Sequence, residues 1–202
     1  MPSRPSARSR SSTRSRRISR RVFLLSLAAA AVYTAAGPAR AHSPYRQWKV
    51  LRQRFLLVHS TRTDPEGDEL AERLVALLQG VLPQANALVG RSRDEARLAA
   101  LLSSGQAMLA VLRPDDARDL FLGRAAFAGQ DARGLRRLLA VESRILATVE
   151  SFPRHHAWLV SAALCENAAG LAVRVPRADE SAVPVHAGAL AYARGEPLEA
   201  AE

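Results

Sequence analysis

Two short polar segments each follow an apolar run that is typical of a buried strand. The first supplies three hydroxyl groups and a guanidinium group, and the second supplies a guanidinium group and a carboxylate. These candidate ligand-binding residues are Ser60, Thr61, Arg62, Thr63, Arg113 and Asp115. Hydroxyl and guanidinium groups donate hydrogen bonds to carboxylates and phosphates. The segments therefore predict a site for a small anionic solute, bound without chemistry; two ordinary solvated loops are the competing interpretation.

The first segment lies between an expected strand and an expected helix. Residues 51–60 predict a strand, and Asp64 followed by Pro65 predicts a helix start, because Asp caps helices and Pro suits their first position. Leucines at steps of three and four residues then give the helix one apolar face. Gly80 and Pro83 are expected to end it.

A second strand and helix lead to the second segment. Residues 85–89 predict a weak strand, Ser92 and Glu95 predict a capping box at the start of a helix, and residues 107–112 predict a third strand. The β-α-β-α-β order implies right-handed crossovers and a parallel sheet, in which ligands bind beyond the carboxyl ends of the strands. We therefore expect an α/β fold in which the two polar segments face one another.

The rest of the chain is expected to complete this fold. Residues 135–149 predict one or two strands, and a helix should follow from Pro153 to about residue 167. Residues 174–182 predict a charged connection, and residues 183–192 close the fold.

The formal net charge of +10 is concentrated at the N-terminus. Of the 29 Lys and Arg residues, nine arginines lie in the first 41 residues, which contain no acidic residue. Removing these nine leaves 20 basic against 19 acidic residues. A nearly neutral folded part argues against a nucleic-acid-binding domain, and an aromatic content of 5% provides few rings for stacking on bases.

The N-terminal residues predict export. Adjacent arginines, Arg20 and Arg21, precede an apolar stretch over residues 22–36, which is typical of a twin-arginine signal, and a small-x-small Ala-Arg-Ala sequence follows. We predict a signal peptide over residues 1–41 and one periplasmic domain over residues 42–202, without a membrane span. An uncleaved N-terminal anchor is the alternative.

Residues typical of catalysis do not form a known motif in this sequence. It contains no Gly-x-Ser-x-Gly, no His-Glu-x-x-His and no Gly-rich phosphate loop, so we expect neither an enzyme nor a cofactor. The single cysteine, Cys165, lies in an apolar run with helical spacing and predicts an inert, buried thiol. Arg133, Arg136 and Arg137 are interpreted as a solvated basic face.

The five histidines follow no tight metal-binding spacing. They are His42, His59, His155, His156 and His186. Neighbouring His155 and His156 are expected to point to different faces of a helix, and His186 to be a structural hydrogen-bonding residue. Cleavage before His42 would place an α-amine beside an imidazole, a pair of nitrogen ligands that suits copper. An N-terminal copper site therefore remains an alternative.

Three segments resemble the periplasmic solute receptors of TRAP transporters, specifically the TAXI type. The first is the strand, helix, helix and strand pattern over residues 54–112, and the second is Ile-Leu-Ala-Thr-Val-Glu-Ser-Phe-Pro at residues 145–153 with its following helix. The third is Val-Pro-Val-His-Ala-Gly-Ala-Leu-Ala-Tyr at residues 183–192, which is similar to the family's His-Pro-Gly-Ala-x-x-Tyr ending. The resemblance implies a type II periplasmic-binding-protein fold with a mostly parallel sheet flanked by helices.

The resemblance also implies a small anionic ligand and, as partners, TRAP membrane subunits or another periplasmic protein. Two departures from the family are visible. The turn after the first strand has no glycine before Gly67, and residues 113–137 leave room only for a connector, so one of the two lobes is missing. A lobe that has lost its ligand would be free to bind a protein, so a periplasmic protein-interaction module is the second hypothesis.

Overall fold

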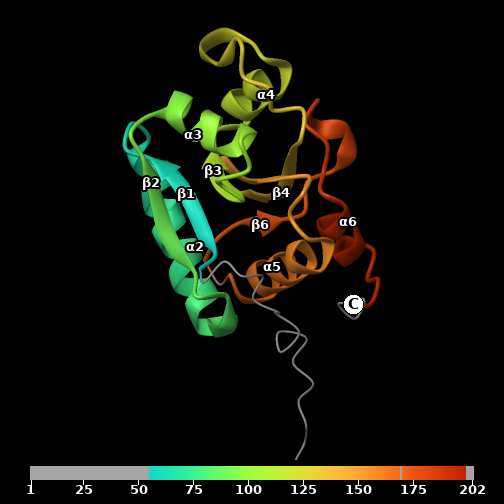
Figure 1. The fold of residues 1–202 in the computed structure, drawn as a ribbon. Coiled ribbons are helices and arrows are strands. Elements are labelled where there is room, and N and C mark those ends of the chain that lie inside the picture. The colour runs from blue at the N-terminus through green and yellow to red at the C-terminus, as the bar shows by residue number, and fades with distance from the viewer. Residues whose placement is uncertain (1–54, 169, 199–202) are drawn as a thin grey trace, which may run out of the picture. The chain divides into compact units, whose positions relative to one another are not determined.

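In residues 55–168 and 170–198, which the computed structural model describes, six strands form a sheet with the order β2-β1-β3-β5-β4-β6 (Figure 1). The strands are β1 (Leu57–Thr61), β2 (Leu88–Ser92), β3 (Leu109–Leu112), β4 (Leu135–Val141), β5 (Arg144–Val149) and β6 (Val173–Arg174). The α-helices are α2 (Pro65–Val81), α3 (Glu95–Ser103), α4 (Pro114–Leu122), α5 (Arg154–Asn167) and α6 (Ala187–Ala193). Short 3₁₀ helices are η2 (Pro83–Ala85), η3 (Ala125–Phe127) and η4 (Ala178–Glu180).

The first three strands form the parallel part of the sheet. β1 pairs in parallel with β2 on one side and with β3 on the other, as the β-α-β-α-β order predicts. β5 runs antiparallel to both β3 and β4, and β6 runs antiparallel to β4. Four of the six strands, β1 to β4, therefore point the same way. The predicted α/β class with helices flanking the sheet is confirmed, and the arrangement is compatible with a single lobe of a periplasmic-binding-protein fold.

Helix α2 shows how the sequence builds the core. It begins at Pro65, as predicted, and its leucines Leu70, Leu74 and Leu78 are at most 2% exposed. Burying a leucine side chain stabilises a fold by about 1.5–3 kcal/mol. These three contacts hold α2 on the sheet beside β1.

The capping prediction for α3 is wrong by two residues. The N-cap is Asp94, whose Oδ1 accepts a 2.8 Å hydrogen bond from the backbone N–H of Arg97. Ser92 instead ends β2, where it pairs with Thr61 of β1. Because the helix begins at Glu95, Ser92 lies three residues before it and is not in the capping position.

The strands and connections in the second half of the chain follow the prediction, except that strand β6 was not predicted. Residues 135–149 form two strands, joined by a turn in which Glu142 has a φ of 52°. Between β3 and β4 the described chain forms α4 and η3, with no further sheet strand. The expected connection over residues 174–182 contains η4 and begins in the short edge strand β6, whose two residues give almost no periodicity to read.

No helix in the described part of the chain has the length and apolarity that crossing a membrane requires. The predicted signal peptide, its cleavage site and His42 lie outside the described residues.

Candidate functional site

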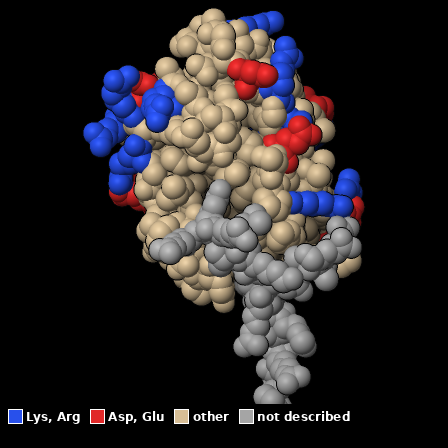
Figure 2. Space-filling model, in the orientation of Figure 1, with Lys and Arg blue, Asp and Glu red and all other residues tan. Residues whose placement is uncertain are grey.

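The two predicted polar segments meet at one edge of the sheet. They follow the neighbouring parallel strands β1 and β3, so both begin at the same end of the sheet. Arg113 Nη2 lies 3.6 Å from Oδ1 of Asp64, the residue after Thr63. Figure 2 shows basic side chains gathered, with acidic ones beside them, over the region where β1 and β2 end in Figure 1. We call this end of β1, β2 and β3 the carboxyl edge.

The hydroxyl groups at the carboxyl edge donate to carboxylates of the protein itself. Ser60 donates to Asp68 at 2.6 Å. Thr61 and Thr63 both donate to Oε1 of Glu95, at 3.3 and 2.8 Å. A hydroxyl group has one proton to donate. These three side chains therefore organise the edge, and they offer acceptor lone pairs rather than protons to a ligand.

The charged predicted residues are more exposed. Arg62 is exposed at the surface, and its positive charge helps to lower the pKa of Asp68. The Arg113 side chain is 49% exposed. Asp115 points away into solvent, 88% exposed and 3.9 Å from Arg118 on the same helix. The carboxyl edge thus presents two exposed guanidinium groups, Arg62 and Arg113, while Asp115 lies in solvent beside Arg118.

A buried ion pair fixes the loop after β1. Asp64 is 7% exposed, and its two carboxylate oxygens accept hydrogen bonds from Nε and Nη2 of Arg144, at 3.0 and 2.8 Å. Burial alone would raise the pKa of Asp64, but the hydrogen bond and charge of Arg144, the nearby Gly67 N–H and the charge of Arg113 outweigh it and lower that pKa. Nη2 of Arg144 also binds Glu66 at 3.0 Å. The pair therefore joins the β1–α2 loop to the start of β5.

Next to this pair lies a hollow of about 220 Å³ that we call the basic hollow. Three arginines from three different strands line it: Arg137 of β4, Arg144 of β5 and Arg174 of β6. Pro114, which directly follows Arg113, also lines it. The hollow therefore continues the carboxyl edge toward β4 and β6.

Arg137 is a charged side chain in a buried position. Its side chain is 4% exposed, and its Nε and Nη2 each donate at 2.8 Å to a backbone carbonyl, of Val183 and Arg177 respectively. Its nearest carboxylate, Glu180, lies 3.7 Å from Nη1, beyond hydrogen-bond distance. Burial lowers the pKa of Arg137, because desolvation penalises its charged form. This guanidinium group is therefore less well compensated than Arg144.

The interpretation of Arg137 as part of a solvated face is wrong. Its neighbours Arg133 and Arg136 are exposed and half-buried, but Arg137 lies inside the sheet beside a register shift between residues 137 and 139. The available signal was an arginine within the apolar run Leu135–Val141. The partners of Arg137 and of Arg144 come from segments roughly 40 to 80 positions away, which local patterns do not reveal.

The histidines divide into different roles. Nδ1 of His186 accepts a hydrogen bond from the N–H of Gly188 at 3.1 Å, and its Nε2 lies 3.0 Å from the carbonyl of Phe152, which confirms its structural role. The expectation that His155 and His156 diverge is wrong, since their ring centroids are 4.0 Å apart. Among the described residues, no group of three or more His, Cys, Asp and Glu side chains could hold a metal ion.

His59 is the one described histidine with both ring nitrogens buried and without a hydrogen-bond partner. It is 8% exposed, and its ring packs so closely over β2 that a Cβ atom added to Gly90 would lie 2.8 Å from it. Burial lowers the pKa of His59. The neutral imidazole is therefore the form that the fold accommodates.

Comparison of the chain with protein-family models, with curated proteins and with solved structures finds no match.

Proposed function

We propose that this chain is an exported periplasmic solute-binding protein, related to TAXI-type TRAP receptors, that binds a small anionic solute without catalysis. The observation that carries the proposal is the basic hollow, where Arg137, Arg144 and Arg174 converge at the carboxyl edge. Ligands of open α/β sheets bind beyond the carboxyl ends of the strands.

The buried charge of Arg137 in the basic hollow favours an anion. The lining has three arginines and two carboxylates, Glu142 and Glu180, and Arg144 is already paired with Asp64, which is not part of the lining. Glu142 binds Arg73 outside the hollow at 2.9 Å, and Glu180 binds Arg174 at 2.8 Å. An anion near Nη1 of Arg137 would provide the compensation that Glu180 gives only at 3.7 Å.

The size of the hollow favours a small solute. Its volume of about 220 Å³ is below the roughly 300–1,000 Å³ of pockets that enclose drug-sized ligands. A short carboxylate fits this space, and the exposed guanidinium groups of Arg113, next to lining Pro114, and of Arg62, farther along the carboxyl edge, contribute long-range attraction. Export by the twin-arginine route and docking to TRAP membrane subunits belong to the same proposal, on the sequence patterns described above.

Titration calorimetry with acetate, succinate and glutamate tests the proposal. Arg174→Gln removes a charge from the hollow at a side chain that is 58% exposed, so the fold should tolerate it. The double variant Arg62→Gln, Arg113→Gln, which we call the approach variant, removes the two exposed guanidinium charges of the carboxyl edge. Arg118→Gln, at a 54% exposed arginine of α4 that does not line the hollow, is the matched control.

At least one of these anions should bind the unmodified protein, and Arg174→Gln should weaken that binding about tenfold. The approach variant should weaken it less and reduce its salt dependence, because it removes only screened, long-range attraction. The control should bind normally. Absence of heat with every anion, or equal binding by the Arg174 variant and the control, would overturn the proposal.

A second candidate, a protein-interaction module, is favoured by exposed apolar side chains at the β2 edge of the sheet. Leu57 and Leu88 are paired across β1 and β2 and are 38% and 42% exposed, and Phe55 is 49% exposed. Replacing both leucines with lysine should abolish capture of a specific periplasmic partner on immobilised protein. Capture that survives this double substitution would argue against an interface at this edge.

A further inference from the structure

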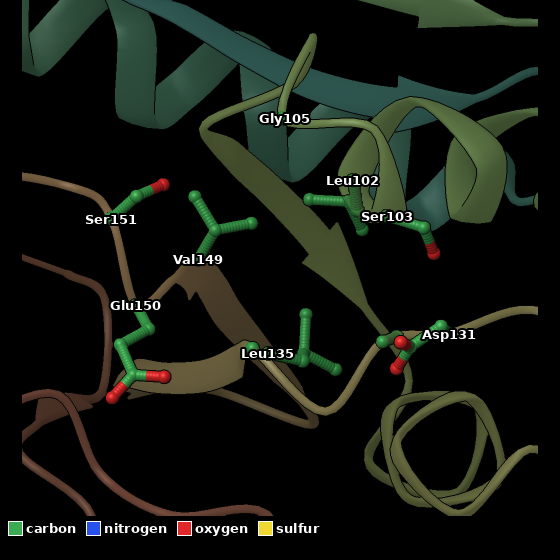
Figure 3. A pocket seen from close by; sticks show the side chains of 10 residues that line it. Leu102, Ser103, Gly105, Asp131, Leu135, Val149, Glu150 and Ser151 are labelled. Carbon is green, nitrogen blue, oxygen red and sulfur yellow. The ribbon is translucent and has the colours of Figure 1, made fainter.

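A second cavity lies at the other end of the strands, away from the carboxyl edge and the basic hollow. It has a volume of about 340 Å³ and is bordered by the end of α3, the start of β4 and the end of β5 (Figure 3). Because β5 runs antiparallel to β3, the end of β5 lies beside the start of β3, away from the carboxyl edge. We call this cavity the acidic-rimmed cavity.

The floor of the acidic-rimmed cavity is aliphatic. Leu102 from α3, Leu135 from β4 and Val149 from β5 approach one another in Figure 3. All three are at most 7% exposed, so their positions are fixed by the core. A rigid apolar floor binds an apolar group without first having to be ordered.

The rim of the cavity is polar and negatively charged. Its two charged residues are both acidic, Asp131 and Glu150, and no basic side chain is part of the lining. Ser103 and Ser151 add a hydroxyl group on either side. The rim is therefore complementary to a positively charged group that also donates hydrogen bonds.

The two carboxylates of the rim differ in their pairing. Glu150 binds Nη2 of Arg136 at 2.6 Å, which neutralises it. Asp131 accepts a hydrogen bond from the backbone N–H of Arg133 at 3.3 Å, and no arginine of the described chain forms an ion pair with it. The neighbouring Arg133 guanidinium lies instead over the ring of Phe121, 5.8 Å from its centroid. Asp131 is thus the carboxylate of the rim that has no ion-pair partner among the described residues.

The serines of the rim are also available. In the described residues, neither the Ser103 nor the Ser151 hydroxyl takes part in a hydrogen bond, whereas neighbouring Ser104 donates to the carbonyl of Leu101 at 3.2 Å. Because the two serines lie on opposite sides of the cavity in Figure 3, one ammonium group can reach the hydroxyl of only one of them. An ammonium group has three N–H donors, so it can pair with a carboxylate and donate to a hydroxyl oxygen at the same time.

We propose that the acidic-rimmed cavity binds a small organic ammonium ion with a short apolar body. The ammonium group pairs with Asp131 and donates to one serine hydroxyl, and the apolar body covers the three aliphatic side chains. This site is separate from the proposed anion site in position and opposite to it in charge. Either site can fail while the other stands.

The test uses 2-phenylethylammonium chloride as the probe, added to the full chain and followed by chemical shifts in ¹H–¹⁵N and methyl NMR spectra. Saturable shifts are expected for residues 102–105, 131–135 and 149–151. The neutral analogue 2-phenylethanol should bind this cavity about threefold to fivefold more weakly, as expected for an exposed ion pair, and the anion 3-phenylpropanoate should not shift the signals of these residues.

Two variants, with one control, test separately the charge of Asp131 and the open volume of the cavity. Asp131→Asn should weaken the ammonium probe about threefold to fivefold, and Asp115→Asn, the same change at an 88% exposed residue of the opposite edge, should leave it unchanged. Gly134→Leu should abolish binding by filling the cavity, because a Cβ atom at this lining residue meets nothing within 4 Å and the fold can accept it.

Absence of saturable shifts with the ammonium probe would overturn the proposal. So would equal affinity for the probe and 2-phenylethanol, or an unchanged affinity in Asp131→Asn. Loss of anion binding at the carboxyl edge leaves all of these outcomes unaffected, so the two proposals are judged separately.

Discussion

The buried ion pair between Asp64 and Arg144 should be a main source of stability at the carboxyl edge. Asp64→Asn keeps the size of the side chain and removes its charge, so the variant isolates the electrostatic part. In the variant, Arg144 stays buried with its charge while losing its bidentate acceptor. A buried charge without a partner is expensive because it has lost its hydration.

The expected loss of stability follows from how little the Asp64 and Arg144 side chains are exposed. The two side chains are 10% and 11% exposed, and breaking a buried pair by removing one partner costs about 3–5 kcal/mol. Glu66 also contacts Arg144, but its carboxylate is 82% exposed, and such pairs contribute about 0–1 kcal/mol. We therefore expect a loss near the lower limit, about 3 kcal/mol, or about 6–12 °C in Tm for a domain of this size.

Urea denaturation followed by circular dichroism measures this loss directly. A double-mutant cycle with Arg144→Gln should give a coupling energy between the two side chains, since the double variant no longer contains an unpaired buried charge. Asp115→Asn removes the same kind of charge from an 88% exposed side chain and should change stability by no more than about 0.5 kcal/mol.

The pH dependence gives an independent check. Because the fold lowers the pKa of Asp64 from its ordinary value of 3.8, the folded state favours the ionised form. Its contribution to stability is fully present above that value and is lost as the pH falls through the lowered pKa. The difference between the unmodified protein and Asp64→Asn should thus be constant near pH 7 and shrink below about pH 4. A difference under about 0.5 kcal/mol at pH 7, or one that persists unchanged to pH 2, would refute the reasoning.

Three further predictions concern groups outside the carboxyl-edge ion pair. Burial lowers the pKa of His59, so the unfolded state binds the proton more readily and the free energy of unfolding should decrease as the pH falls below 6.5. In urea titrations, His59→Phe should lose less stability between pH 7.5 and pH 5 than the unmodified protein, and equal losses would contradict this. Gly188→Ala should destabilise the fold by about 1–3 kcal/mol, because the new Cβ atom would meet the carbonyl of Arg154 and would lie 2.7 Å from the Cβ of Ala157. Gly134→Ala, in open space, should leave stability unchanged, and similar losses of stability in the two variants would count against the packing of α6 on α5. Burial, with a contribution from the charge of neighbouring Glu166, raises the pKa of Cys165 from 9.0 to about 11. At pH 8, alkylation of this thiol by iodoacetamide should therefore be about 100-fold slower in the folded than in the urea-unfolded protein, and comparable rates would show that the fold does not raise the pKa of Cys165.

The parallel half of the sheet was predictable because its signals are local. An apolar run, an Asp-Pro helix start and leucines at helical spacing occur together within residues 55–81, and short connections then leave parallel pairing as the expected arrangement. The meeting of the β1 and β3 loops followed from the same rule. The structural role of His186 was also visible, in its position just before a small-residue helix.

The roles of the predicted site residues were not predictable in the same way. Ser60 and Thr63 were expected to donate to a ligand, but they donate to Asp68 and Glu95, eight and 32 positions away. The spacing of hydroxyl groups shows where they lie and does not show which acceptors the fold brings to them. That Ser60 and Thr63 contact a ligand at all remains a prediction.

By itself, the sequence determined most of the longer helices and strands and that the loops after β1 and β3 share an edge, because these depend on interactions between residues close along the chain. The tertiary structure alone decided that Asp64 is neutralised by Arg144, that Arg137 is buried with a distant carboxylate, and that a cavity with an acidic rim opens at the other edge. The reason is physical: the energy of a charge depends on its burial and on its nearest partner, and both are set by parts of the chain that only folding brings together.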